Sequence, residues 1–286
     1  MDRWRITLAA LFMTVLYGCS QPSPLFDPSR YGTIERDIPY CVVDGIPLLM
    51  DIYFPAEGGT WPVILSVHGG GWSGGDKAQV DGGLTEFGYL VVAINYRLYP
   101  EARFPAMIED VKCAIRSLRA HAAEYNLDPD RIGLTGGSAG GHLVALAGTA
   151  DESAGFDVGE YLEQSSRVQA VQVVAGPSDL TLPFPDWAGS TLREVFGADQ
   201  LAGASPVTYI SEDDPPFLIF HGEVDGVVPV QQAVVLHEQL LEAGVASRLV
   251  IIENADHGLN AIDGPISPAW EELLQISLDF WATNLR

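Results

Sequence analysis

The chain has 286 residues, 47% of them hydrophobic, which is long enough for one large globular domain or two small ones. It carries 38 acidic against 15 basic residues, a formal net charge of −23. A surface this acidic repels polyanions, so nucleic acid is excluded as an expected partner.

The N-terminal segment is typical of an exported lipoprotein. Two arginines precede the apolar residues 6–18, a stretch too short to span a bilayer but suited to a secretory signal. The four residues ending at Cys19 resemble the lipobox in which bacterial lipoproteins are lipidated. We therefore expect a signal peptide at 1–18, a tether at 19–33 and a membrane contact made only through the lipid on Cys19. The cell envelope follows as the expected location, in the outer membrane or on its periplasmic face; the alternative is a buried N-terminal helix.

Two further cysteines remain, Cys41 and Cys113. Export permits a disulfide between them. Because Cys113 falls inside a helical pattern, we expect two free, buried thiols instead. No Cys or His spacing typical of a metal site occurs, so no metal is expected.

Strand-like and helix-like segments alternate from about residue 34 to the end of the chain. Residues 34–43 and 47–54 flank Asp44-Gly45, a dipeptide typical of a hairpin turn, which predicts an antiparallel pair. Further strands are expected at 63–67, 90–95, 131–135, 168–175, 217–220 and 248–252, and helices near 104–121 and at the C-terminus.

This alternation predicts an α/β fold in one domain, residues 34–286. The sheet should be mostly parallel, with about eight strands and helices on both faces. Residues 181–210 interrupt the alternation with prolines and aromatic residues, which predicts a small or minimal cap.

A serine motif lies between an expected strand and an expected helix. Gly136-Gly137-Ser138-Ala139-Gly140 matches the pattern G-x-S-x-G, in which a sharp turn presents the serine Oγ to a base. The flanking glycines are needed because the turn leaves no room for side chains. We predict Ser138 as a nucleophile.

A glycine-rich loop, His68-Gly69-Gly70-Gly71-Trp72, follows the strand expected at 63–67. Backbone N–H groups in such a loop stabilise negative charge on a carbonyl oxygen, and glycines allow a close approach. We predict an oxyanion hole formed by the N–H groups of Gly70, Gly71 and Ala139. The glycines also fit the dinucleotide pattern G-x-G-x-x-G, but a loop follows them and the next strand ends in Asn95 rather than an acid.

The nucleophile needs a histidine and a carboxylate, and both follow strands late in the chain. Asp225 lies beyond the strand at 217–220 and His257 beyond the strand at 248–252, where carboxyl ends of parallel strands converge. Asp179 is the main competing acid, and Glu223 a weaker one. His68, His142 and His221 are expected to be structural, with His68 supporting the glycine loop.

Together these blocks resemble the α/β-hydrolase esterases related to hormone-sensitive lipase. The resemblance covers about 38–284 and is carried by three blocks: 68–77, 95–106 and 136–142. The last block is closer to the small bacterial esterases that include feruloyl and acetylxylan esterases. The resemblance implies the α/β-hydrolase fold and the same triad, Ser138, Asp225 and His257.

The resemblance also implies a serine carboxylesterase with no cofactor. Its expected substrate is a neutral, short-acyl ester, either a small molecule or linked to a polysaccharide, and Trp72, Phe184 and Trp187 are candidate walls of its binding site. Two alternatives stay open: an amidase, formamidase or peptidase with the same triad, and a surface lipoprotein that binds a ligand without turnover.

Overall fold

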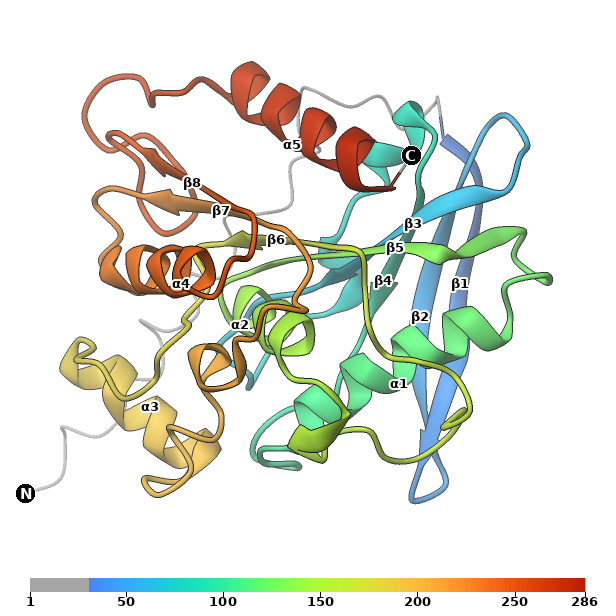
Figure 1. Cartoon of the computed structure of the whole chain (residues 1–286), viewed down its shortest axis with the longest axis horizontal. Helices are drawn as coiled ribbons and strands as arrows, with labels where there is room; N and C mark the ends of the chain where they lie inside the picture. The colour runs from blue at the N-terminus through green and yellow to red at the C-terminus, as the bar shows by residue number, and fades with distance from the viewer. Residues whose placement is uncertain (1–30, 286) are drawn as a thin grey trace, which may run out of the picture.

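Eight strands form one sheet in the order β1-β2-β4-β3-β5-β6-β7-β8 (Figure 1). The computed structural model describes residues 31–285. The strands are β1 (Tyr31–Val43), β2 (Ile46–Pro55), β3 (Trp61–Val67), β4 (Leu90–Ile94), β5 (Leu127–Gly137), β6 (Ala170–Val174), β7 (Phe217–Gly222) and β8 (Ser247–Ile252). The helices are α1 (Ala106–Ala120), α2 (Ala139–Thr149), α3 (Asp186–Phe196), α4 (Gln231–Glu242) and α5 (Trp270–Leu285).

The opening hairpin has the predicted turn. Asp44 and Gly45 both have positive φ, 52° and 80°, the geometry that Asp-Gly favours between two twisted strands. β1 pairs with β2 antiparallel, and β2 pairs with β4 antiparallel. All the remaining pairings are parallel, which confirms the predicted α/β sheet.

Helices cover both faces of the sheet. α1, α2 and α4 lie on one face and α5 on the other (Figure 1). This covering explains why β3 is a continuous apolar run: Val63, Ile64 and Leu65 are all fully buried, whichever face they point to. On the α5 side, Trp281 and Leu285 pack against Ile64.

The element boundaries differ from the predicted ones by a few residues. β1 begins at Tyr31 rather than at residue 34, and β5 extends from Leu127 to Gly137. α3 lies within the predicted cap segment, 181–210. The predicted signal peptide, Cys19 and the tether up to residue 30 lie outside the described residues. Within the described part, no helix is long and apolar enough to cross a membrane.

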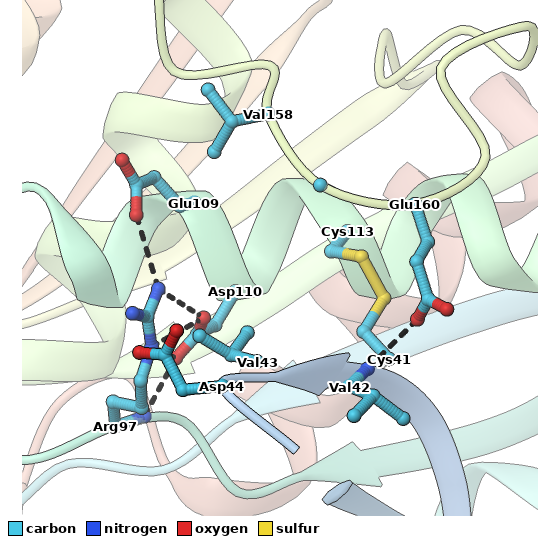
Figure 2. Close-up of a pocket in the computed structure, with 11 residues that line it drawn as sticks. Cys41, Val42, Val43, Asp44, Arg97, Glu109, Asp110, Cys113, Val158 and Glu160 are labelled. Atoms are coloured by element: carbon cyan, nitrogen blue, oxygen red, sulfur yellow. Dashed lines mark hydrogen bonds and ion pairs between the residues drawn. A yellow bond between two sulfur atoms is a disulfide. The ribbon is translucent and has the colours of Figure 1, made fainter. Parts of the chain in front are cut away.

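The expectation of two free thiols is wrong. Cys41 on β1 and Cys113 on α1 form a disulfide, with their Cα atoms 6.4 Å apart (Figure 2). The helical pattern around Cys113 was correctly predicted. A helix packed against a strand nevertheless brings its strand-facing side chains within bonding distance of that strand, and the 72 residues of separation conceal this contact in the sequence.

The disulfide lines a cavity of about 230 Å³ between the β1–β2 hairpin, α1 and the loop around Val158 (Figure 2). Four of its charged side chains are bound to one another or to the backbone: Arg97, Glu109, Asp110 and Glu160. Arg97 donates to Asp110 at 2.9 Å and to Glu109 at 3.0 Å. The wall of this cavity therefore carries an ion-pair cluster in which Arg97 is shared by Glu109 and Asp110.

Candidate active site

Ser138 occupies the turn between β5 and α2. Its φ and ψ are 56° and −121°, a strained conformation for a residue with a side chain. The turn is fixed to the sheet because the Ser138 N–H donates to the carbonyl of Val174 at 2.9 Å. A Cβ atom at Gly140 would collide with the backbone oxygen of Val67, so a glycine is required beside the serine. The predicted strand–serine–helix turn is present.

Three side chains distant in sequence meet at this turn. His257 Nε2 lies 2.9 Å from Ser138 Oγ, and His257 Nδ1 lies 2.7 Å from Asp225 Oδ2. These partners assign the tautomer: Nδ1–H donates to the carboxylate, and Nε2 accepts from the serine hydroxyl. The His257 side chain is 24% exposed, whereas that of Asp225 is fully buried. The arrangement has the geometry of a nucleophile, a base and an orienting acid.

The loops after β7 and β8 bring Asp225 and His257 together. The two strands are parallel neighbours, so their carboxyl ends lie at the same edge of the sheet. The Val224 N–H donates to the carbonyl of Ala255 at 3.1 Å, which binds one loop to the other. The register of the sheet thus sets the distance between the acid and the base.

The Asp225 carboxylate accepts three hydrogen bonds and lies 3.2 Å from a fourth polar group, His221 Nε2. Oδ1 accepts from the N–H groups of Val227 and Val228, at 2.8 and 2.9 Å. Oδ2 faces both His257 and His221. Burial by itself would raise the pKa of Asp225, but the hydrogen bonds from His221, His257 and the Val228 N–H outweigh it and hold the pKa well below its usual range. Asp225 is therefore ionised at neutral pH.

Neither competing carboxylate contacts His257 in the structure. Asp179 Oδ1 accepts from the N–H and hydroxyl of Thr181, at 3.0 and 2.6 Å. Glu223 Oε2 accepts from the N–H of Asn254 at 3.2 Å. Both acids follow strands at the same edge of the sheet, but Asp179 binds its own loop and Glu223 binds the backbone of the loop after β8.

The glycine loop after β3 is strongly curved. Gly70, Gly71 and Trp72 have consecutive positive φ values of 115°, 60° and 59°. Among the described residues, no backbone carbonyl accepts from the N–H groups of Gly70 or Gly71. Ala139 is the first residue of α2, so its N–H has no partner one turn earlier in that helix. These three N–H groups are the predicted donors for a developing oxyanion.

His68 supports this loop, as predicted. Its Nδ1–H donates to the Gly69 carbonyl at 2.7 Å, and its ring stacks on Tyr96 with centroids 4.4 Å apart. The Tyr96 hydroxyl in turn donates to the His68 carbonyl at 3.1 Å. Burial lowers the pKa of His68, which favours the neutral ring.

His142 is also structural, and it holds Trp72. Its Nδ1 accepts from the Trp72 indole N–H at 3.2 Å, and its Nε2–H donates to the carbonyl of Ala204 at 2.7 Å. Burial lowers the pKa of His142 to about 4, so the ring is neutral at physiological pH. Phe196 of α3 packs edge-on against the Trp72 ring. The helix of the nucleophile, the glycine loop and α3 therefore share one buried junction.

A cavity of about 70 Å³ opens beside Ser138. The three predicted wall residues, Trp72, Phe184 and Trp187, all line it. Several lining residues lie outside the predicted set: Pro177, Ala188, Thr191, Leu192, Val227 and Val228. Val227 and Val228 follow Asp225 closely, so their position in the sequence could have indicated them. The α3 residues carry no motif, and no signal in the sequence points to them.

Within residues 31–285, no group of three or more His, Cys, Asp or Glu side chains is placed to hold a metal ion.

The model of the BD-FAE family matches residues 50–240. Probable carboxylic ester hydrolase LipM of Mycobacterium tuberculosis is 40% identical over 189 residues, 61% of this chain and 44% of that protein. The chain spans about half the length of the curated relatives it matches.

Two solved structures are similar over most of the chain. A truncated form of a carbohydrate esterase from gut microbiota superposes with a TM-score of 0.78 at 30% identity, covering 90% of this chain and 98% of that one. Thermogutta terrifontis esterase 2 phosphorylated by paraoxon gives a TM-score of 0.74 at 29% identity, covering 87% and 94%.

Proposed function

Because the chain belongs to the BD-FAE family of α/β-hydrolases, we propose that it hydrolyses carboxylic esters with Ser138, His257 and Asp225 as its catalytic triad. The observation that carries this proposal is the pair of hydrogen bonds, 2.9 and 2.7 Å, that joins these three side chains across 119 and 32 residues of sequence. The relatives named as esterases support the same reaction class.

In the proposed reaction, Ser138 Oγ attacks the ester carbonyl while His257 Nε2 takes its proton. The charge that develops on the carbonyl oxygen is stabilised by the N–H groups of Gly70, Gly71 and Ala139, each of which contributes about 3 kcal/mol in comparable sites. His257 then gives the proton to the leaving alcohol, and the acyl group stays on the serine.

A water molecule completes the cycle by the same route. His257 takes a proton from the water, the hydroxide attacks the acyl-enzyme, and the serine leaves with the returned proton. Asp225 stays ionised throughout and stabilises the imidazolium form of His257. The low pKa of this buried carboxylate suits that role.

We propose short-acyl, neutral esters as the substrates. The cavity beside Ser138, about 70 Å³, is far below the roughly 300 Å³ or more of pockets that enclose larger ligands. A net charge of −23 disfavours anionic substrates. Trp187 lines this cavity and is 52% exposed, so it offers an aromatic surface to an alcohol part that extends into solvent. The carbohydrate esterase among the structural relatives supports sugar esters as candidates.

The test is hydrolysis of nitrophenyl esters from acetyl to dodecanoyl, with the matching acetanilide alongside. We expect turnover that falls with acyl length and a loss of about 10⁶-fold in kcat for Ser138→Ala. Paraoxon should form an adduct on Ser138, located by peptide mass spectrometry. Turnover of the amide alone would assign the protein to amide hydrolysis, and a folded protein inert to all of these compounds would exclude the proposed reaction.

We further propose export and lipidation at Cys19. The Cys41–Cys113 disulfide supports an oxidising compartment, because disulfides are rare in the cytosol. Labelling of cells with an alkyne-tagged fatty acid should mark the wild-type protein and leave Cys19→Ala unmarked, and fractionation should place the labelled protein in the outer membrane. A labelled Cys19→Ala variant would refute this site.

A further inference from the structure

A second histidine contacts the carboxylate of the triad. His221 lies at the end of β7 and is 0% exposed. Its Nε2 lies 2.9 Å from the carbonyl oxygen of Val228 and 3.2 Å from Asp225 Oδ2. Its Nδ1 has no partner among the described residues. The proposed reaction gives this ring no role.

We propose that His221 is a positioning residue that shares Asp225 Oδ2 with His257 and thereby sets how strongly Asp225 holds the proton of His257. This inference rests on the proposed function, since it assigns His257 as the base. His221 acts through Asp225 and does not touch the reacting atoms.

The partners of His221 determine its tautomer. Both atoms that face Nε2, the Val228 carbonyl oxygen and the ionised Asp225 carboxylate, are acceptors only. Nε2 must therefore carry the hydrogen, which leaves Nδ1 unprotonated, buried and without a hydrogen-bond partner among the described residues. One N–H then serves two acceptors, with the shorter distance to Val228.

This hydrogen fixes the acid loop as well as the carboxylate. Asp225 Oδ1 is held by Val227 and Val228, and the Val228 carbonyl is held by His221. The loop from residue 221 to residue 228 is thereby closed on itself around the carboxylate. Val228 also lines the cavity beside Ser138, so the same histidine supports the acid and a wall of the binding site.

Sharing one oxygen has an electrostatic consequence. The His221 N–H, with Nε2 3.2 Å from Oδ2, places positive partial charge beside that oxygen. The carboxylate then stabilises a proton on His257 less strongly. If the donor is removed, His257 should keep its proton to higher pH. Loss of the Asp225 orientation alone would move protonation of His257 in the opposite direction, because an anion beside the ring would be displaced.

The other titratable groups around this pair do not compete for it. The carboxylates of Glu223, Asp256 and Asp179, on the loops after β7, β8 and β6, each accept a backbone N–H. His142 donates to the carbonyl of Ala204, and His68 donates to the carbonyl of Gly69. Within residues 31–285, His257 and His221 are the two side chains with a polar contact to the Asp225 carboxylate, at 2.7 and 3.2 Å.

The experiment compares the full-length wild type with His221→Leu and His221→Gln. Leucine fills the site without a donor, and glutamine carries an amide N–H that can replace Nε2–H. The readout is the pH profile of kcat/KM for a neutral acetyl ester. We expect the acid limb of His221→Leu to lie roughly half a pH unit above that of the wild type, with His221→Gln returning toward the wild type. His237→Leu on α4, whose ring binds Ser247 away from the triad, should leave the limb unchanged.

An acid limb that stays in place or moves to lower pH in His221→Leu would overturn the proposal. A second measurement needs neither a variant nor turnover: the ¹⁵N shifts of the wild-type imidazoles report which nitrogen of His221 is protonated. We expect the Nε2–H form, and an Nδ1–H form would overturn the proposal. A wild type that hydrolyses no ester would refute the proposed function, and the His221 tautomer would still be tested.

Discussion

Two cavities of this molecule differ in what their walls can do. The larger, about 230 Å³, lies at the disulfide, where Arg97 and Asp110 neutralise each other. The smaller, about 70 Å³, contains Ser138, whose hydroxyl is bonded to a histidine that a carboxylate orients. The smaller one lies where parallel strands end, so groups from separate loops converge there. The candidate active site is therefore identified by a nucleophile, a base and an acid that converge on it. The volume of a cavity does not identify it.

The comparison predicts that changes near Ser138 affect turnover and changes near the disulfide affect stability. Asp225→Asn should have the largest effect, a fall of about 10⁴-fold in kcat, because the amide favours the wrong tautomer of His257. Thermal unfolding should show that the variant is folded. Asp179→Asn is the matched control and should keep wild-type kcat; the reverse result would transfer the role of the acid to Asp179.

The double variant Cys41→Ala/Cys113→Ala should unfold more easily. Its 72-residue loop predicts a loss of about 4 kcal/mol in the free energy of unfolding, chiefly because the unfolded chain gains freedom. Urea unfolding measures this loss, and the wild type in reductant should behave like the variant. We expect kcat of the folded variant to stay within about twofold of the wild type. A large fall in kcat would show that the disulfide region also affects turnover, which would contradict the comparison.

Stability should decrease in acid because of His142. Its pKa is lowered to about 4 in the folded chain, against 6.5 when unperturbed. Between these values the unfolded chain binds a proton that the folded chain does not, so stability falls as the pH decreases from about 6.5 to about 4, by about 3 kcal/mol in all. The free energy of unfolding measured across this range tests the slope, which His142→Gln should reduce; His68, whose pKa burial also lowers, keeps part of it. An unchanged slope in the variant would assign it to other groups.

The smallest expected effect concerns acyl length. Leu192 of α3 is buried and lines the small cavity, so Leu192→Ala should lengthen the space beside Ser138. The ratio of kcat/KM for butyrate esters to kcat/KM for acetate esters should rise roughly tenfold. Burial of one or two additional methylene groups of the acyl chain changes kcat/KM by about this factor. Val158→Ala, in the wall of the larger cavity, should not change the ratio. An equal rise in both variants would mean that the small cavity does not hold the acyl group.

Local patterns in the sequence predicted the sheet and the site in outline. Alternating apolar segments gave the strands and helices because their periodicity reflects burial, and Asp44-Gly45 predicted its turn because few residues tolerate positive φ. The glycines around Ser138 predicted the strand–turn–helix geometry for the same reason. The order of Ser138, Asp225 and His257, each after a strand, followed from the rule that parallel strands end at a common edge.

Tertiary structure decided everything that depends on side chains meeting across long separations. The sequence offered three acids at one edge, and only the packing of the β7 and β8 loops shows that Asp225 faces His257 while Asp179 and Glu223 bind elsewhere. The disulfide between Cys41 and Cys113 was not predicted, because a contact across 72 residues leaves no local pattern in the sequence. Spacing along the chain fixes which loop a residue occupies, whereas the register of the sheet and the packing of helices fix what its side chain touches.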